Sequence, residues 1–373
     1  MHRLQFHYTL GRDSSPALIR NPLIDLLQAV STEGSISAGA RALGLSYRHV
    51  WGELKRWENE LGNELIIWEK GQSARLTEFG AKLMWAERQA QARLAPQIES
   101  LRSDLERAFA VAFDDNAHVV TLYASHDDAL AALREHALTI DDSSMAKLHL
   151  DIRFCGSVDA IRGLNEGRCV MAGFHTLQQP APGSLAERVY KPLLQPGLHK
   201  IIGFAQRTQG LMVTPGNPRG LQALSDLKRT SARFVNRALG TGTRVVLDEL
   251  LAQGGLQSTD IHGYEHTEPS HTAVAQAVAS GAADVGLGIE LAARTRGLDF
   301  VPLVQENYHL VCLKSALQEP AIVALLAVLK SPRWQAQLAA TAGYTPALSG
   351  EIQSMREVLP WWDFRKKKGK KGP

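Results

Sequence analysis

The spacing of apolar residues changes once along this chain and divides it into two kinds of structure. Between Pro22 and about Phe113 the apolar residues recur with a period near 3.6, as in an α-helix. After Asn116 short apolar segments alternate with helical ones, such as LHLDIRF followed by SVDAIRGLNEG. Alternating strands and helices predict a parallel sheet. We therefore expect a multi-domain chain: a mainly α region, then an α/β domain.

Length and composition fit several folded cores. The 373 residues are 45% hydrophobic and 21% charged, which is ordinary for two or three globular domains. The N-terminal residues show no apolar segment behind a basic one, and no later stretch reaches the roughly 20 apolar residues that cross a bilayer. We expect a cytoplasmic protein without membrane contact.

The cysteines and the net charge say less about function than the pattern of apolar residues does. Cys155, Cys169 and Cys312 lack metal-ligand spacing, so we expect buried free thiols and no metal site. The net charge of +3 does not by itself indicate nucleic-acid binding. Part of it comes from a basic C-terminal tail that ends the 351–373 segment; such a run is usually solvated, and can add sequence-independent attraction to phosphates.

Residues 21–62 have the pattern of a helix-turn-helix. Asn21 and Pro22 begin a first helix, a second covers about residues 37–43, Gly44 breaks it, and Ser46 caps a third. The expected core residues are Leu23, Leu26, Leu27 and Val30, then Ala38, Ala42 and Leu43, then Val50, Leu54, Trp57 and Leu61. In such a motif the second of the two helices around the turn reads the major groove from its N-terminal residues.

A hairpin follows, with strands expected over 64–69 and 74–76, the size of a wing that contacts phosphates. The candidate DNA contacts are Ser35, Ser37, Ser46, Tyr47, Arg48, His49, Lys55, Arg56, Lys70 and Arg75. The alternative is that these helices only pack a core, because the same Ala, Gly and Leu spacings occur in enzymes. For each single basic residue, both interpretations stay open.

Residues 77–116 predict a linker helix of more than thirty residues. Its apolar stripe is Phe79, Leu83, Ala90, Leu94, Ile98, Leu101, Leu105 and Phe109. One helix of this length cannot bury such a stripe alone, so we expect a homodimer, and Pro96 should kink or split the helix. A symmetric dimer would bind double-stranded DNA at an inverted-repeat operator.

Three junctions between strands and helices carry small polar residues. They are Ser125, His126 and Asp127; Gly156 and Ser157; and Gly240, Thr241, Gly242 and Thr243. Because helix N-termini present free N–H groups and a partial positive charge, each junction can hold an anion, and Arg237 and Arg244 add cationic donors. His126, His175 and His271 can join the site or be structural. Asp284 can accept a donor from the ligand, but a structural role is favoured.

The N-terminal stretch SISAGARALGLSYRHVWGELKRWENELG, with ELIIWEK and ARLTEFG after it, resembles the winged helix-turn-helix of ModE-type and LysR-type regulators. SYRHVW is closer to ModE. The resemblance covers about a quarter of the chain and implies a DNA-binding domain at residues 1–76. LysR-type relatives often form tetramers, so a homotetramer stays open beside the dimer.

Residues 117–350 resemble the periplasmic-binding-protein-like domain found with ModE-type domains and molybdopterin-synthesis proteins, in QGLMVTPGNPRG, FVNRALGTGTRVVLDELL and HTAVAQAVASGAADVGLGIE. The resemblance implies a type II topology with two lobes, one over about 117–204 and 307–346 and the other over 205–306. It also implies molybdate, tungstate or molybdopterin as effector, with no covalently bound cofactor. Because a small oxyanion can be held by neutral N–H and hydroxyl donors alone, the three histidines favour the larger molybdopterin as ligand.

Two features depart from these families. The families lead us to expect a Tyr-Asn pair some way after His175, and the nearest candidate is Val189-Tyr190-Lys191-Pro192. We also do not find the further molybdate-binding domain of ModE in the sequence. The ligand of ModE therefore cannot simply be transferred.

We expect a ligand-responsive transcription regulator, in which closure of the lobes reorients the DNA-binding domains. The sequence shows no GxSxG, HExxH or Walker motif, so we expect no enzyme. The alternatives are a protein of molybdenum-cofactor biosynthesis or transport, and a regulator that senses an unrelated organic anion.

Overall fold

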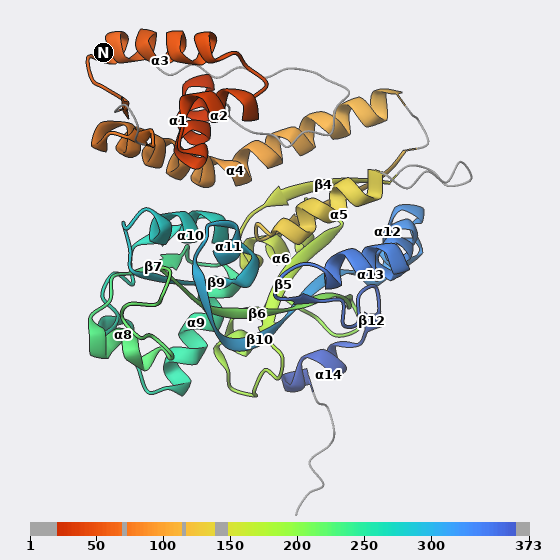
Figure 1. The fold of residues 1–373 in the computed structure, drawn as a ribbon. Coiled ribbons are helices and arrows are strands. Elements are labelled where there is room, and N and C mark those ends of the chain that lie inside the picture. Colours follow the sequence, from red (N-terminus) through yellow and green to blue (C-terminus); the bar gives the residue numbers. More distant parts are fainter. Residues whose placement is uncertain (1–20, 69–72, 114–116, 139–147, 363–373) are drawn as a thin grey trace, which may run out of the picture. The chain divides into compact units, whose positions relative to one another are not determined.

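The structure is a computed structural model that describes residues 21–68, 73–113, 117–138 and 148–362. The chain divides into two compact units, Met1–Ala95 and Pro96–Pro373, which are described separately (Figure 1). None of the helices in the described part of the chain is both long enough and apolar enough to cross a membrane.

The first unit contains the expected helix-turn-helix. Its elements are α1 (Pro22–Glu33), α2 (Ile36–Ala42), α3 (Tyr47–Leu61), the antiparallel pair β1 (Ile66–Ile67) and β2 (Arg75–Leu76), and the start of α4 (Glu78–Phe113). The side chains of Asn21, Ser35 and Ser46 cap α1, α2 and α3. The predicted starts of α1 and α3 are confirmed, because these caps fix where helical hydrogen bonding begins.

The predicted buried face of the second helix was wrong. Ile36, Gly39 and Ala40 face the core, whereas Ala42 and Leu43 are exposed. The cause is a close approach of two backbones: a Cβ added at Gly39 would lie 3.0 Å from the carbonyl carbon of Ala29. In α3, Val50 and Leu54 are buried as expected, but Trp57 and Leu61 are only partly buried.

The linker is one 36-residue helix, α4, which continues through Pro96, so it is not split there. The boundary between the two units nevertheless falls at this proline. Part of the predicted apolar stripe is exposed: Leu101 is 59% exposed and Leu105 is 37% exposed. The described side chains that α4 buries in the second unit include Pro96, Ser103 and Ala110.

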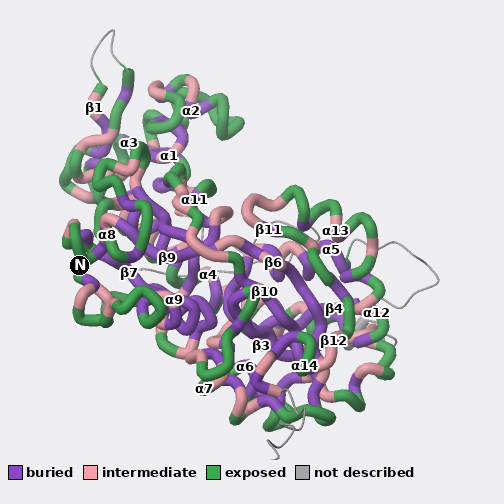
Figure 2. Tube along the Cα trace, turned by 90° about the horizontal axis from the view of Figure 1, so that it is seen from below, coloured by how far each residue is buried: buried purple, intermediate pink, exposed green. Residues whose placement is uncertain are grey.

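The second unit is built on one large sheet whose strands are largely buried (Figure 2). The path of strands is β4-β3-β5-β10-β6-β9-β7-β8. Their bounds are β3 (His118–Ala124), β4 (Leu148–Phe154), β5 (Met171–Leu177), β6 (His199–Val213), β7 (Phe234–Arg237), β8 (Thr267–Glu268), β9 (Val285–Ile289) and β10 (Asp299–Leu313). The α/β fold class is confirmed, with parallel pairing of β3 with β4 and β5, and of β7 with β8 and β9.

The strands β6 and β10 run antiparallel to each other over 15 residues each. The lobe boundaries expected near residues 204 and 307 fall inside these two strands, and they stay a prediction. Short strands β11 (Tyr344–Thr345) and β12 (Ile352–Gln353) also pair with β6.

Helices follow the strands as the sequence pattern predicts. They are α5 (Asp128–Leu138), α6 (Ser157–Asn165), α7 (Leu185–Tyr190), α8 (Ser225–Thr230), α9 (Gly242–Gln253), α10 (His271–Ala279), α11 (Glu290–Thr295), α12 (Pro320–Lys330), α13 (Pro332–Ala339) and α14 (Met355–Val358), with 3-10 turns η1 (Ser258–Asp260), η2 (Lys314–Gln318) and η3 (Pro360–Trp362). Residues 355–361 contribute Met355 and Trp361 to a core cluster, so this part of the expected tail packs on the domain. The basic residues after it lie outside the described residues.

The second half of α4 covers the edge strand β4. The Ser103 hydroxyl accepts a hydrogen bond from Ile152 N at 2.8 Å and donates to Leu150 O at 3.3 Å. The Ser100 hydroxyl accepts from Phe154 N at 3.1 Å. The helix thus satisfies backbone groups that a neighbouring strand would otherwise pair.

The three cysteines carry free thiols. Cys169 and Cys312 are buried, as expected, and Cys155 is partly exposed. Burial raises the pKa of the Cys169 thiol to about 11, which keeps it protonated and unreactive at neutral pH.

Candidate DNA-binding surface and ligand site

The first turn of α3 presents the expected DNA-contacting side chains to solvent. Tyr47, Arg48 and His49 are exposed directly after the Ser46 cap. One to two turns later, exposed Lys55 pairs with Glu58 at 2.6 Å, and exposed Arg56 pairs with Glu53 at 2.5 Å. This arrangement gives the helix a polar, partly basic N-terminal face.

The other candidates are placed differently. Ser35 caps α2 through its hydroxyl, Ser37 is exposed on α2, and Arg75 is exposed on β2. Lys70 lies outside the described residues. The candidate DNA contacts stay a prediction.

One exposed aromatic residue of α3 was missed. Trp51 is 42% exposed one turn after Tyr47, and Lys55 Nζ lies 6.0 Å from the centre of its ring. The sequence argument assigned apolar helix residues to the core, so Trp51 was not considered for the surface. The signal was available, because residues 47, 51 and 55 share one helix face.

Glu58 fixes α3 to the hairpin. Its carboxylate accepts hydrogen bonds from Leu65 N at 2.9 Å and Ile66 N at 3.4 Å. Burial alone would raise its pKa, but the hydrogen bonds from Lys55 and the two backbone groups outweigh it, so the pKa of Glu58 is lowered.

We expect Glu58→Gln to lower the free energy of unfolding of the first unit by about 1–3 kcal/mol at pH 7, because a buried amide leaves one backbone N–H poorly paired. A lowered folded-state pKa means that the carboxylate stabilises the fold above the ordinary Glu pKa of about 4.3 and loses this effect as the pH falls through the folded-state value. The difference from the wild type should therefore shrink below pH 4 in denaturant titrations. The control is Glu60→Gln, because Glu60 is exposed on the same helix. An equal loss of stability in this control, or a stability difference for Glu58→Gln that does not change with pH, would contradict the role given to Glu58.

The predicted ligand residues of the three junctions come together in the second unit. Ser125, His126 and Asp127 follow β3, and Gly156 and Ser157 begin α6. Thr241, Gly242 and Thr243 begin α9. The side chains at these junctions are less than a tenth exposed, as are those of His175, Arg237 and His271.

Glycines allow these segments to touch. A Cβ added at Gly156 would lie 2.8 Å from the carbonyl oxygen of Gly240, and one added at Gly242 would lie 2.3 Å from a ring carbon of His175. Side chains cannot be accommodated at either distance without movement. The segments that the sequence assigned to two different lobes are therefore in direct contact.

Side-chain hydrogen bonds continue across the same place. The Thr243 hydroxyl accepts from Gln209 Nε2 at 3.1 Å and lies 3.3 Å from His271 Nε2. Ser125 and Ser157 hydroxyls lie 3.4 Å apart. These contacts join β3, β6, α6, α9 and α10 into one buried polar cluster.

A buried ion network beside this cluster was missed by the sequence argument. Arg207 pairs with both Asp127 and Glu306, and its Nη2 lies 3.3 Å from His175 Nδ1. The Tyr344 hydroxyl donates to Asp127 at 2.6 Å. Arg207 and Glu306 occupy β6 and β10. Both are flanked by polar residues in the sequence, so no apolar context singled them out as buried charges.

Arg237 is the unpaired cation of the cluster. It is 1% exposed, and its Nε and Nη1 atoms have no hydrogen-bond partner among the described residues. Burial, and then the neighbouring charge of Arg207, lowers the pKa of Arg237 to about 9, so it is still charged at neutral pH. The charges of Asp127 and Glu306 oppose this shift, but neither forms an ion pair with Arg237 in the described structure. A buried guanidinium with unpaired N–H groups is unfavourable.

The two nearby histidines are neutral. Burial and the surrounding arginines hold the pKa values of His175 and His271 well below the ordinary range. His175 Nε2 and His271 Nδ1 have no hydrogen-bond partner within the described structure. Neutral imidazoles with one free nitrogen can donate to a ligand without adding charge.

Two other candidates have partners of their own. The Arg244 guanidinium lies 3.9 Å from the Tyr264 ring centre and 3.3 Å from Asp248. Asp284 is held by Arg233 and Arg219 at 2.8 and 2.9 Å, which supports its structural interpretation. Tyr190, which lies in the nearest counterpart of the family's Tyr-Asn pair, is fully buried, and burial raises its pKa.

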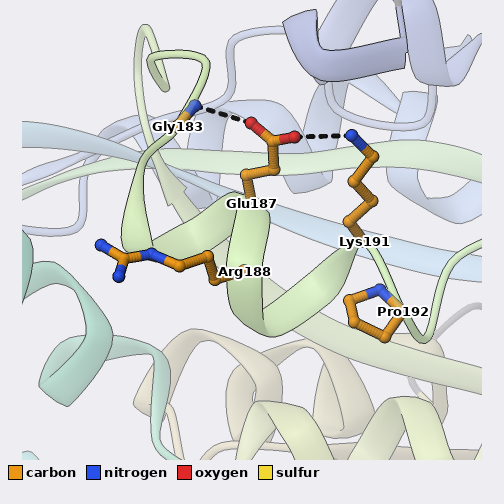
Figure 3. A pocket seen from close by; sticks show the side chains of 5 residues that line it. All are labelled: Gly183, Glu187, Arg188, Lys191 and Pro192. Atoms are coloured by element: carbon orange, nitrogen blue, oxygen red, sulfur yellow. Dashed lines mark hydrogen bonds and ion pairs between the residues drawn. The ribbon is translucent and has the colours of Figure 1, made fainter.

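A surface hollow of about 660 Å³ lies elsewhere, along α7 (Figure 3). Glu187 accepts from Gly183 N at 2.7 Å and pairs with Lys191 at 2.6 Å, while Arg188 points away from this pair. None of the cluster residues lines it. Within the described ranges, no group of three or more His, Cys, Asp or Glu residues is arranged to hold a metal ion.

Comparison with known families agrees with this division. Residues 23–81 match the family described as bacterial regulatory helix-turn-helix protein, lysR family. Residues 142–330, about half of the chain, match the PBP superfamily domain. The fold and the two matches thus define a chain that joins a LysR-type helix-turn-helix to a PBP-like α/β domain. The chain belongs to the PBP superfamily.

Individual relatives are similar over parts of the chain. The uncharacterized protein YvgK of Bacillus subtilis (strain 168) is 34% identical over 200 residues, which is 54% of this chain and 64% of that protein. The chain thus spans less than two thirds of YvgK. An uncharacterized protein of the ferredoxin 2Fe-2S gene 5' region of Clostridium pasteurianum is 33% identical over 109 residues, 29% of this chain and 96% of that protein. A peroxide-bound OxyR variant of Corynebacterium glutamicum aligns at 17% identity with a TM-score of 0.43, over 84% of this chain and 92% of that one.

Proposed function

We propose that this protein is a transcription regulator that binds DNA through its LysR-type helix-turn-helix and responds to an anionic ligand. The observation that carries the ligand part is the buried, unpaired guanidinium of Arg237 beside the start of α9. The helix N-termini of α6 and α9 add partial positive charge where they meet. The DNA part rests on the matched family and on the exposed N-terminal face of α3.

The ligand site has a physical route to the linker helix. His126 Nε2 lies 3.8 Å from Glu99 Oε1 on α4, so a junction residue contacts the helix that leads to the DNA-binding unit. Arg102 pairs with Glu135 of α5 at 3.1 Å, one turn further along α4. We propose that ligand binding shifts α4 through these contacts. This requires that the ligand binds two arrangements with different affinity.

Molybdate, tungstate and molybdopterin are the ligands that the sequence resemblance to the ModE-associated domain suggests, and we propose them as first candidates. All three are anions, which the unpaired N–H groups of Arg237 favour. The operator is proposed to be an inverted repeat, bound by a homodimer or by a pair of dimers.

The exposed stripe of α4 supports dimerisation. We expect the double variant Leu101→Glu and Leu105→Glu to convert the dimer into a monomer, because it places four charges in a symmetric apolar interface. Operator affinity should fall by at least about 100-fold, since two half-sites would no longer bind together. Light scattering and gel-shift titration measure the two effects, and Val323→Glu, exposed on α12, is the control. An unchanged mass of the double variant would place the interface elsewhere.

The function is tested with the full chain. Operator sequences are first selected from random DNA, and affinity for them is then measured with and without molybdate, tungstate or extracted molybdopterin. Thermal unfolding with the same ligands reports binding directly, because a ligand that binds only the native state raises its stability. If the selection yields no preferred DNA sequence, the proposed role as a transcription regulator is refuted. If DNA is selected but the affinity of the protein for it is the same with and without every ligand that raises its thermal stability, the coupling through α4 is refuted.

A further inference from the structure

The ligand site also contains unpaired acceptors. Glu306 Oε2 and Gln209 Oε1 are buried and have no hydrogen-bond partner among the described residues. Both side chains are fully buried. An anion that carries only acceptor oxygens would leave these two atoms unpaired, and would place negative charge beside the Glu306 carboxylate.

The orientation of Gln209 is determined by its neighbours. Its Nε2 atom donates to Glu306 Oε1 at 2.9 Å and to the Thr243 hydroxyl at 3.1 Å. Only the amide nitrogen can donate to a carboxylate, so the amide oxygen must be on the other side. The oxygen of Gln209 is thus an available acceptor.

One oxygen of the Glu306 carboxylate is occupied by two hydrogen-bond donors. Its Oε1 atom accepts from Arg207 Nε as well as from Gln209. Burial raises the pKa of Glu306, while the charge of Arg207 opposes this shift. With Oε1 already occupied by two donors, Oε2 is the acceptor that is left.

The free donors are on other residues of the cluster. Because Arg207 donates to His175 Nδ1, the neutral imidazole carries its proton on Nε2, which is unpaired. Thr243 accepts from Gln209 and can donate its own proton to His271 Nε2, which leaves the proton of His271 on Nδ1. Together with Arg237, these atoms form a set of donors for an anionic group.

The charged groups of the cluster are also only partly paired with one another. Asp127 and Glu306 are both paired with Arg207, and Arg237 is left without a carboxylate. These four groups carry two positive and two negative charges. A ligand that has an anionic group and, separately, hydrogen-bond donors would satisfy both sides without leaving a buried group unpaired.

We infer that the site is built for an anion that also carries O–H or N–H donors, with the anionic group on Arg237, His175 and His271 and the donors on Glu306 and Gln209. This inference rests on the proposed anion-sensing function. It favours a hydrogen oxyanion or an organic anion such as a pterin phosphate over molybdate and tungstate. The latter carry no proton at neutral pH.

Calorimetry of the full chain at pH 7 tests this with matched probes. Sulfate, molybdate and tungstate are donor-free; inorganic phosphate and neopterin monophosphate are donor-bearing, one inorganic and one organic. We expect the better donor-bearing probe to bind at least about 100-fold more tightly than sulfate, because a site with buried hydrogen-bonding groups rejects analogues that leave them unpaired. Which of the two binds identifies the source of the ligand.

Glu306→Gln gives opposite predictions for the two classes of probe. It should weaken the donor-bearing probe at least tenfold, and it should leave or raise affinity for sulfate, because it removes a negative charge. Gln209→Leu should also weaken binding of the donor-bearing probe. It replaces Glu306→Gln as the test if that variant does not fold. If a donor-free oxyanion binds most tightly of all the probes, this inference is overturned, but the proposal that the protein senses an anion still stands. No binding of any probe would overturn both.

Discussion

Arg237→Met should stabilise the free protein and abolish its response to the ligand. Replacing a buried charge by an apolar side chain of similar length removes an unpaired guanidinium, and comparable replacements raise the free energy of unfolding by about 1–4 kcal/mol. The same change removes the cation that faces the anion, which should lower affinity by about 2–5 kcal/mol, or roughly 30- to several thousand-fold. Denaturant titration and calorimetry measure the two effects separately.

The pH dependence gives a second signature. Because the pKa of Arg237 is lowered to about 9, the folded protein releases this proton before the unfolded chain does. Wild-type stability relative to the variant should therefore rise as the pH passes through about 9, and the gap between them should shrink. Arg188→Met, an exposed arginine on α7, should show neither effect. A variant that is less stable at pH 7 and still binds the anion would show that Arg237 has a partner and is structural.

Arg207→Met should have the opposite effect on stability. It leaves Asp127 and Glu306 buried without their shared cation, and breaking a buried pair in this way costs about 3–5 kcal/mol. Burial already raises the pKa of Glu306, and without the charge of Arg207 this carboxylate should take up a proton in the folded state at a higher pH than in the unfolded chain. The deficit at pH 7 should therefore shrink toward pH 5, which unfolding curves across this range would record.

Arg207→Lys is the matched control, because it keeps the charge but cannot bridge two carboxylates with one planar group. We expect it to lose part of the stability and to show a weaker pH dependence. A deficit of Arg207→Met that is small, or the same at pH 5 and pH 7, would mean that packing of the arginine, and not its charge, is what stabilises the domain.

The sequence was sufficient for the features set by local rules. Capping residues such as Ser46 and breaking glycines such as Gly44 act on their immediate neighbours, so the helices of the first unit were placed from them. The strand and helix alternation in the binding domain was likewise predictable, because buried strands appear as short apolar segments.

The features that depend on distant contacts were not predictable in the same way. The buried face of α2 is set by the backbone of α1 at Gly39, which no periodicity encodes. The junction residues were predicted individually, but Arg207 and Glu306, which are 99 residues apart in the chain, meet only because β6 pairs with β10. Trp51 was missed because an aromatic residue in a helix pattern has two interpretations, core and surface, that only the packed unit separates.

The hydroxyls of Ser100 and Ser103 have a consequence for how this protein can be divided. They occupy backbone donors of β4, which is the outer strand of the sheet on that side. A fragment that begins at His118 would leave this strand open to pairing with another molecule, a recognised route to aggregation. A fragment made to isolate the second unit should therefore begin no later than Pro96, so that the second half of α4 still covers β4.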